Sequence, residues 1–299
     1  MKRLLNTLYI TSGNRYLSLD GENVVVMEDK KEIGRIPLHN LQAIVTFGYT
    51  GASPALMGAC AQRNIELSFM SGNGRFLARV SGEEKGNVTL RKTQYRISER
   101  KEESVKIAKN FILGKVYNAR WVLERAARDY SMRLDAELLK KRSAFLGQSM
   151  NKIRECEDAG TLLGLEGEAA SVYFSAFDER ILQQKEDFYF HGRNKRPPLD
   201  NVNAMLSFGY SLLAGMCGGA LEAVGLDPYV GFFHTDRPGR MSLALDLMEE
   251  FRSVMVDRFV LTLINKRIMK PEYFLTKENG AVIMTEEGRK AFLSAWQGK

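Results

Sequence analysis

The chain has 299 residues, of which 44% are hydrophobic and 26% charged, a composition typical of a globular protein with room for two domains of ordinary size. Its 43 Lys and Arg against 36 Asp and Glu give a net charge of +7, which favours polyanionic partners such as nucleic acid or an acidic membrane surface. The three cysteines, Cys60, Cys156 and Cys217, are odd in number and far apart, which excludes a disulfide framework and a Cys-based structural zinc site.

The cysteine usage and the N-terminus indicate a reduced, cytoplasmic location. The start, MKRLLNTLYITSG, is basic and then partly apolar, but Asn6 and Thr7 interrupt it, and no signal peptide is expected. The uncharged stretch from Asn203 to Leu221 is long enough to span a bilayer, yet glycines, serines and an asparagine dilute it. We therefore expect a buried helix of a soluble protein and no membrane partner.

The first eighty residues alternate between polar and apolar side chains, as half-buried strands do. The segments TLYI, RYLSL and NVVVME are separated by turn formers and predict an antiparallel sheet. Ser53 and Pro54 begin a short helix that runs to about Gln62. The segments IELSFM and RFLARV flank a turn at residues 71–74 and predict a hairpin.

The polar run SGEEKGN, from residue 82, marks a change to helical spacing of the apolar residues. The predicted fold class is therefore α+β, with a β-rich domain at residues 1–84 and a larger all-helical catalytic domain at residues 85–299. The apolar pattern predicts helices at roughly 89–98, 103–129, 133–156, 161–185, 202–224 and 241–267. A small hairpin between Tyr273 and Met284 and a last helix that begins after Thr285 complete the prediction.

Glu166, in the segment TLLGLEGEAASVYFSAF, is a first candidate for chemistry. If Thr161 caps this helix, Glu166 shares a face with Ala170 and Tyr173, whereas Glu168 points elsewhere. A carboxylate on an apolar stripe is costly unless it is paired or binds a metal. On this segment alone, a solvated Glu166 or one paired with an arginine is the favoured reading.

A second group of candidates lies in LDPYVGFFHTDRPGRMSLALDLMEEFR. His234 precedes a helix on which Asp246 and Glu249 are three residues apart and share a face. Two adjacent carboxylates require positive charge between them, which either a divalent cation or Arg252 can supply. One imidazole with carboxylates is a mainly oxygen donor set that suits Mg²⁺ or Mn²⁺, the metals of phosphodiester chemistry.

Basic residues are spread along the helical part, where a phosphate backbone could contact them, although each alone is more often a solvated surface charge. They are Arg91, Arg96, Lys115, Arg120, Arg193, Lys195, Arg196, Arg237 and Arg240.

Several separated motifs together resemble a known family, the CRISPR-associated integrases called Cas1. They are NVTLRKTQY, GKVYNARWVL, LLGLEGEAASVYF, RNKRPPLDNVNAMLSFGYSLL, LDPYVGFFH and SLALDLMEEFR, which occur in the family's order along nearly the whole chain. The resemblance implies a β-strand N-terminal domain that dimerises, a helical catalytic domain, double-stranded DNA as substrate and a complex with the small protein Cas2.

By motif, the resemblance implies that Glu166, His234 and Glu249 are the catalytic metal ligands for Mg²⁺ or Mn²⁺. Asp246 matches a further acidic position of the family in the same helix. The resemblance implies that it either supports a metal ligand or binds a second metal. The residues expected to position DNA or the active-site loops are Arg91, Asn203, Arg240 and Ser242.

The implied reaction inserts a short DNA fragment into a CRISPR array, through attack of its 3′-hydroxyl on a phosphodiester. Two alternatives stay open at this point. The acidic residues of a non-catalytic DNA-binding scaffold would merely pair with arginines, and a metal-dependent nuclease of broad specificity would use the same ligands to activate water.

Overall fold

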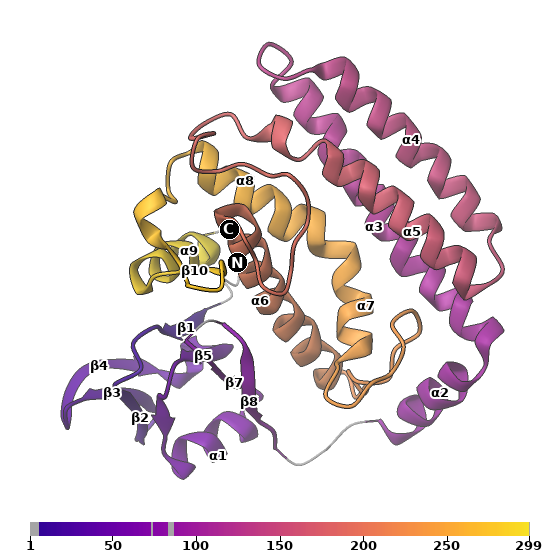
Figure 1. The fold of residues 1–299 in the computed structure, drawn as a ribbon. Coiled ribbons are helices and arrows are strands. Elements are labelled where there is room, and N and C mark those ends of the chain that lie inside the picture. The colour runs from indigo at the N-terminus through magenta and orange to yellow at the C-terminus, as the bar shows by residue number, and fades with distance from the viewer. Residues whose placement is uncertain (1–5, 73, 83–86, 299) are drawn as a thin grey trace. The chain divides into compact units, whose positions relative to one another are not determined.

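The structure is a computed structural model that describes residues 6–72, 74–82 and 87–298. Contacts between Cα atoms divide the chain into two compact units. The first unit comprises residues 1–85, 272–275 and 283–299, and the second comprises residues 86–271 and 276–282. Strands concentrate in the first unit and long helices in the second, which confirms the predicted α+β class (Figure 1).

Two sheets form most of the first unit within its described residues. One has the order β1-β5-β7-β8 and the other the order β4-β3-β2-β6. The strands of the first sheet are β1 (Thr7–Ile10), β5 (Ala43–Phe47), β7 (Glu66–Met70) and β8 (Phe76–Val80). Those of the second are β4 (Lys31–Pro37), β3 (Asn23–Glu28), β2 (Arg15–Asp20) and β6 (Gly51–Ala52).

The predicted antiparallel pairing is confirmed for β2–β3 and β3–β4 but is wrong for the rest of the two sheets apart from β7–β8. Strand β5 pairs in parallel with both β1 and β7, and β2 pairs in parallel with β6, whereas the predicted β7–β8 hairpin is antiparallel. Parallel neighbours need a crossover connection, which helix α1 (Pro54–Gln62) provides between β5 and β7. Alternating polar and apolar residues show that a strand is half-buried, but they do not give its direction.

Helix α1 begins as the sequence predicts. The Ser53 side chain accepts a hydrogen bond from the Leu56 backbone N–H at 3.2 Å, and Pro54 occupies the first helical position. Leu56 is fully buried with Leu17 and Ile44 of the two sheets, so the helix covers the core of this unit.

The C-terminal residues confirm the predicted hairpin and last helix. Strands β9 (Phe274–Thr276) and β10 (Val282–Met284) pair, and α9 (Glu286–Gln297) follows Thr285, whose side chain accepts a hydrogen bond from the Gly288 backbone N–H. The Ser12 hydroxyl donates to Glu286 Oε1 at 2.7 Å, so α9 lies in the first unit although residues 85–299 were assigned to one domain. Contacts between Cα atoms do not test whether a unit folds on its own. The predicted domain division therefore stays a prediction.

The second unit is built from long helices, with a π-helical turn directly before its last helix. The helices are α2 (Val88–Glu99), α3 (Lys101–Asp129), α4 (Ala136–Glu155), α5 (Ala159–Ser175), α6 (Asn201–Ala223), α7 (Ser242–Phe251) and α8 (Arg258–Asn265), with the π-helical turn at Arg252–Asp257 between α7 and α8. The predicted helix at 161–185 was too long. The apolar pattern continues through buried Phe177 and Ile181, but the chain turns at Ala176 and the Asp178 carboxylate accepts a hydrogen bond from the Phe190 backbone N–H.

Helix α3 is the element that positions the functional residues of this unit. It packs against α4, α5 and α7, and Figure 1 shows α4 and α5 running alongside it. Ile112 and Leu123 of α3 are fully buried with Leu139 and Leu146 of α4. A side chain between these two positions on α3 can therefore reach both α5 and α7.

Helix α6 passes a length and composition test for a membrane span. Of the most apolar stretch of this helix, 61% is buried inside the structure. A buried helix at the centre of a globular unit passes the same test. The predicted core helix agrees with this burial, and the absence of a membrane partner stays an expectation.

Candidate metal centre

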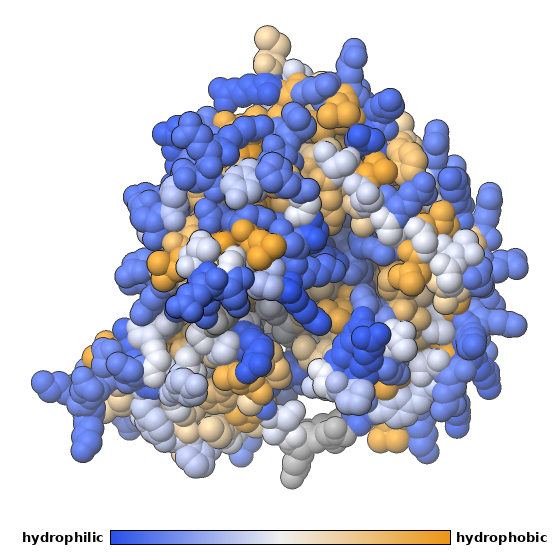
Figure 2. All heavy atoms as spheres, viewed as in Figure 1, coloured by the Kyte–Doolittle hydropathy of each residue, from blue (hydrophilic) through white to orange (hydrophobic). Residues whose placement is uncertain are grey.

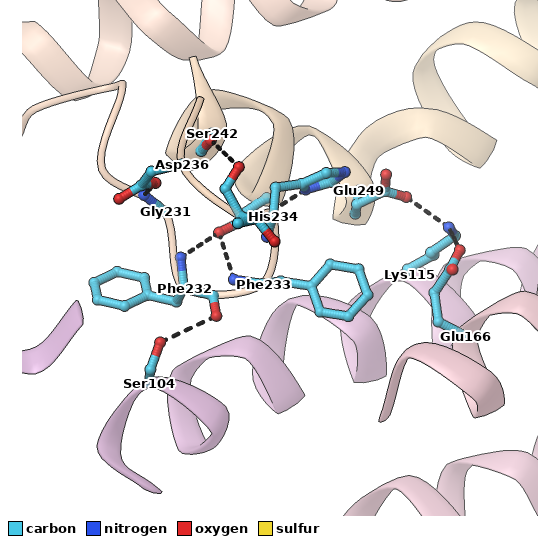
Figure 3. Close-up of polar contacts among 12 residues, drawn as sticks. Ser104, Lys115, Glu166, Gly231, Phe232, Phe233, His234, Asp236, Ser242 and Glu249 are labelled. Atoms are coloured by element: carbon cyan, nitrogen blue, oxygen red, sulfur yellow. Dashed lines mark hydrogen bonds and ion pairs between the residues drawn. The ribbon is translucent and has the colours of Figure 1, made fainter. Parts of the chain in front are cut away.

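Two of the predicted ligands meet at one positive charge (Figure 3). Lys115, in the middle of α3, donates a hydrogen bond from Nζ to Glu166 Oε1 of α5. The same Nζ forms an ion pair with Glu249 Oε2 of α7 at 2.6 Å. The Glu249 side chain is 5% exposed, and those of Lys115 and Glu166 are 14% and 17% exposed. Lys115 thus holds a place between two carboxylates from different helices.

Arg252 supplies the second positive charge at Glu249. Its Nη1 donates a hydrogen bond to Glu249 Oε1 at 2.7 Å. This is the ion pair with Arg252 that was predicted as the alternative to a divalent cation. Burial raises the pKa of Glu249, but Arg252 and Lys115 together outweigh burial and lower this pKa to about 2. Glu249 is therefore an ionised donor with one oxygen on each cationic partner.

His234 is oriented by Asp246, which is fully buried on α7. Asp246 Oδ2 accepts hydrogen bonds from the backbone N–H groups of Phe232 and Phe233 at 2.7 and 2.9 Å. Its Oδ1 accepts from the His234 backbone N–H at 2.9 Å and lies 2.7 Å from His234 Nδ1. This contact assigns the imidazole proton to Nδ1 and leaves the Nε2 lone pair for a ligand. Of the two roles predicted for Asp246, the contacts support that of orienting His234.

Further contacts hold the backbone of the His234 loop. Ser104 Oγ of α3 donates to the Phe232 carbonyl at 3.0 Å, and Ser242 Oγ donates to the Thr235 carbonyl at 3.2 Å. A Cβ atom on Gly231 would lie 2.8 Å from Ser242 Cβ and 2.9 Å from Asp246 Oδ2, distances that real Cβ atoms essentially never show. Only glycine fits at this position without a shift of the loop.

The remaining predicted residues occupy different surroundings. Asn203 and Ser242 are fully buried, and the Asn203 amide bonds with Arg193, Asn194, Gly192 and Asp200. Their contacts support a role in holding loops, and direct contact with DNA stays a prediction that this burial disfavours. Arg91 on α2 and Arg240 before α7 are partly exposed, and their contact with DNA also stays a prediction.

The donor set fits a divalent cation, although the present arrangement is closed around Lys115. Among the described residues, no three His, Cys, Asp or Glu side chains lie close enough together to hold a metal ion. The ammonium of Lys115 stands where a cation would balance Glu166 and Glu249, and Figure 3 shows the His234 ring pointing towards Glu249. Two carboxylates and one imidazole Nε2 are ligands that Mg²⁺ and Mn²⁺ accept.

Sequence reasoning missed the roles of Lys115 and Gly231. Lys115 was expected to contact phosphate, although it interrupts an apolar stripe formed by Ile112, Val116 and Ala119 on α3. A lysine in such a stripe signals a buried acidic partner. Gly231 lies in an apolar segment without a turn signal, so only the close approach of α7 reveals why a side chain is excluded there.

The comparisons with known proteins place the chain among CRISPR-associated proteins. The family model described as "CRISPR associated protein Cas1" matches residues 8–298. The chain belongs to the Cas1 family. It is 50% identical over 301 residues to "CRISPR-associated endonuclease Cas1 2" of Rhodospirillum rubrum, with 99% of this chain and 87% of the relative covered.

Solved structures share the fold. A Cas1 protein from Thermotoga maritima aligns with a TM-score of 0.83 and 23% identity, covering 98% of this chain and 90% of that one. A "Casposase bound to integration product" aligns with a TM-score of 0.82 and 26% identity, covering 98% and 82%. A chain of a "Cas6-RT-Cas1--Cas2 complex" aligns with a TM-score of 0.80 and 23% identity, covering 99% of this chain and 32% of that chain.

Replacing Asp246 by Asn tests its control of His234. The variant keeps the size of the side chain but removes an acceptor that serves two N–H groups, so we expect Mn²⁺ affinity to fall by about 10–100-fold. The free energy of unfolding should fall by more than about 1 kcal/mol. Electron paramagnetic resonance of free Mn²⁺ and urea denaturation measure the two effects. Asp236→Asn is the control, because its amide oxygen can still accept from the Gly231 N–H; equal Mn²⁺ affinity in both variants contradicts the role.

Replacing Gly231 by Ala tests the close approach of the loop to α7. The added methyl group forces the loop away from Asp246, so the free energy of unfolding should fall by about 1–3 kcal/mol, together with Mn²⁺ affinity. Gly164→Ala in α5 is the matched control, since its Cβ meets nothing within 4 Å, and it should raise stability by about 0.5–1 kcal/mol. Equal stability of the two variants in thermal unfolding rejects the steric explanation.

Proposed function

We propose that this protein is a divalent-metal-dependent DNA endonuclease and integrase of CRISPR adaptation. In this proposal it inserts short double-stranded DNA fragments into a CRISPR array by attack of a 3′-hydroxyl on a phosphodiester. The observation that carries the proposal is the meeting of Glu166 and Glu249 on one cationic group. The family membership and the casposase-like fold support the class of reaction.

Each residue of the centre has a distinct part in the proposed reaction. Glu166 and Glu249 supply carboxylate oxygens, and His234 supplies the Nε2 lone pair that Asp246 leaves available. A bound Mg²⁺ or Mn²⁺ would polarise a phosphoryl oxygen and stabilise charge on the phosphate. His234 would bind a metal through this lone pair only as neutral imidazole.

Positive side chains near this centre support a phosphate-bearing substrate. Partial desolvation and then the neighbouring charges of Arg252 and Arg193 lower the pKa of Lys195. The charges of Lys115 and Glu249 also affect the pKa of Lys195. Lys195, in the 192–200 loop, therefore lies near the candidate centre. Adjacent cations repel one another, and a bound phosphate relieves that repulsion.

The proposed assembly follows the family. We propose a homodimer formed through the N-terminal domains, and a heteromeric complex with Cas2 that binds double-stranded DNA in the cytoplasm. The relative in the Cas6-RT-Cas1--Cas2 complex supports this choice of partner.

A joining assay with Glu166→Ala tests the proposed function. The protein is supplied with a labelled DNA fragment that has a free 3′-hydroxyl and with a supercoiled plasmid that contains the repeats. The wild-type protein should join label to plasmid when Mn²⁺ is present, and EDTA should abolish joining. Glu166→Ala should lose joining while it keeps its fold and DNA binding, because one metal ligand is removed.

Glu168→Ala is the matched control, since Glu168 is exposed on the same helix two residues away. Joining that survives Glu166→Ala rejects the proposed centre. Strand breakage without joined product identifies the nuclease alternative. Salt-sensitive DNA binding that is indifferent to EDTA, with neither breakage nor joining, identifies the scaffold alternative.

A further inference from the structure

A hollow borders α3 on a side that does not face Lys115. It is lined by residues of α3 from Trp121 to Arg128, by the start of α4, and by Val254 and Arg258. Its volume is about 1330 Å³, including the part open to solvent. Trp121 follows Lys115 by six residues, which advances it by about 9 Å and rotates it by about 240° around the helix. None of Glu166, His234 and Glu249 lines this hollow.

The hollow carries an excess of positive charge. Four of its lining residues are cations: Arg125, Arg128, Lys140 and Arg258. Asp129 offsets part of this charge, because it pairs with Arg125 at 3.2 Å and with Arg128 at 2.9 Å. The carboxylate of Glu124, also in the lining, accepts a hydrogen bond from Ser143 and is thereby directed towards α4. Four cations against two carboxylates leave two positive charges for a ligand.

Trp121 gives the hollow an aromatic wall. This residue is 51% exposed, although tryptophan is usually well buried. The ring of Tyr117, one turn earlier on α3, lies edge-on with its centroid 6.1 Å away and an interplanar angle of 64°. Val122 and Val254 add apolar lining. The indole is therefore supported from the side while much of its surface faces solvent.

We propose that this hollow binds a nucleotide, with the base against Trp121 and the phosphate held by the surrounding cations. A flat indole beside cationic groups is the arrangement that binds unpaired bases and their phosphates. Bases in a duplex are already stacked and do not offer a face, and an acidic peptide would use the charge but not the ring. The ligand is thus a free mononucleotide or a nucleotide of a single strand. The site is independent of the function proposed for the metal centre.

Intrinsic fluorescence tests the proposal, because the chain has only two tryptophans and the other, Trp296, is 8% exposed. The full-length protein is titrated in EDTA, with excitation at the red edge of the indole band. The ligands are AMP, single-stranded decathymidylate, a DNA duplex, hexaglutamate and inorganic phosphate. Quenching by AMP alone identifies a free nucleotide, and quenching by decathymidylate at lower concentration identifies a single strand. Absence of quenching, quenching by the duplex only, or equal quenching by hexaglutamate or phosphate overturns the proposal.

Substitutions in the lining of the hollow test whether the ligand binds there. Arg258→Gln should weaken binding by about threefold or more, as for one exposed charge contact, and Lys106→Gln, an exposed position elsewhere on α3, should leave it unchanged. Trp121→Leu should weaken binding of the effective ligand, measured by titration calorimetry, by about fivefold or more. Equal affinities in Arg258→Gln and Lys106→Gln, or in Trp121→Leu and the wild type, overturn the assignment. Unchanged unfolding midpoints show that each variant remains folded.

Discussion

Acidic side chains buried in the helical unit require positive charge, and this requirement shapes the candidate centre. Glu249 is 4% exposed yet has a pKa of about 2, because Lys115 and Arg252 outweigh the cost of its burial. Arg252 is itself held, with its guanidinium 4.3 Å from the centroid of the Tyr210 ring. The Tyr210 hydroxyl in turn donates to Asp257, a fully buried carboxyl whose pKa burial raises. The charge balance at Glu249 thus extends through α6 and the π-helical turn.

His234 lies in a loop of the same unit, yet it is held as firmly as a side chain on a helix. Asp246 does this from α7, because one buried carboxylate binds three successive backbone N–H groups and the imidazole. Gly231 allows the loop to approach α7 closely enough for these contacts. The geometry of His234 is therefore set by a helix, and rigid support of this kind is what a metal ligand needs.

The sequence predicted those features that depend on local pattern. It located the α1 cap at Ser53, the separation of Glu166 from Glu168 by helical phase, and most helix limits, which follow from periodicity and capping chemistry. It did not give the parallel pairing of β5, the end of α5 at Ser175, or the position of Lys115 between two carboxylates. Each of these depends on contacts between segments far apart in the chain, which periodicity does not encode.

We propose that a divalent cation competes with the Lys115 ammonium for the place between Glu166 and Glu249. The most direct measurement is the dissociation constant for Mn²⁺ of the wild type and of Lys115→Met, by electron paramagnetic resonance, with Lys106→Met as control. Removal of the competing ammonium should tighten Mn²⁺ binding on the order of tenfold, equivalent to about 1.4 kcal/mol, and leave the control unchanged. Weaker binding by Lys115→Met, or no stoichiometric binding by either protein, would contradict the account.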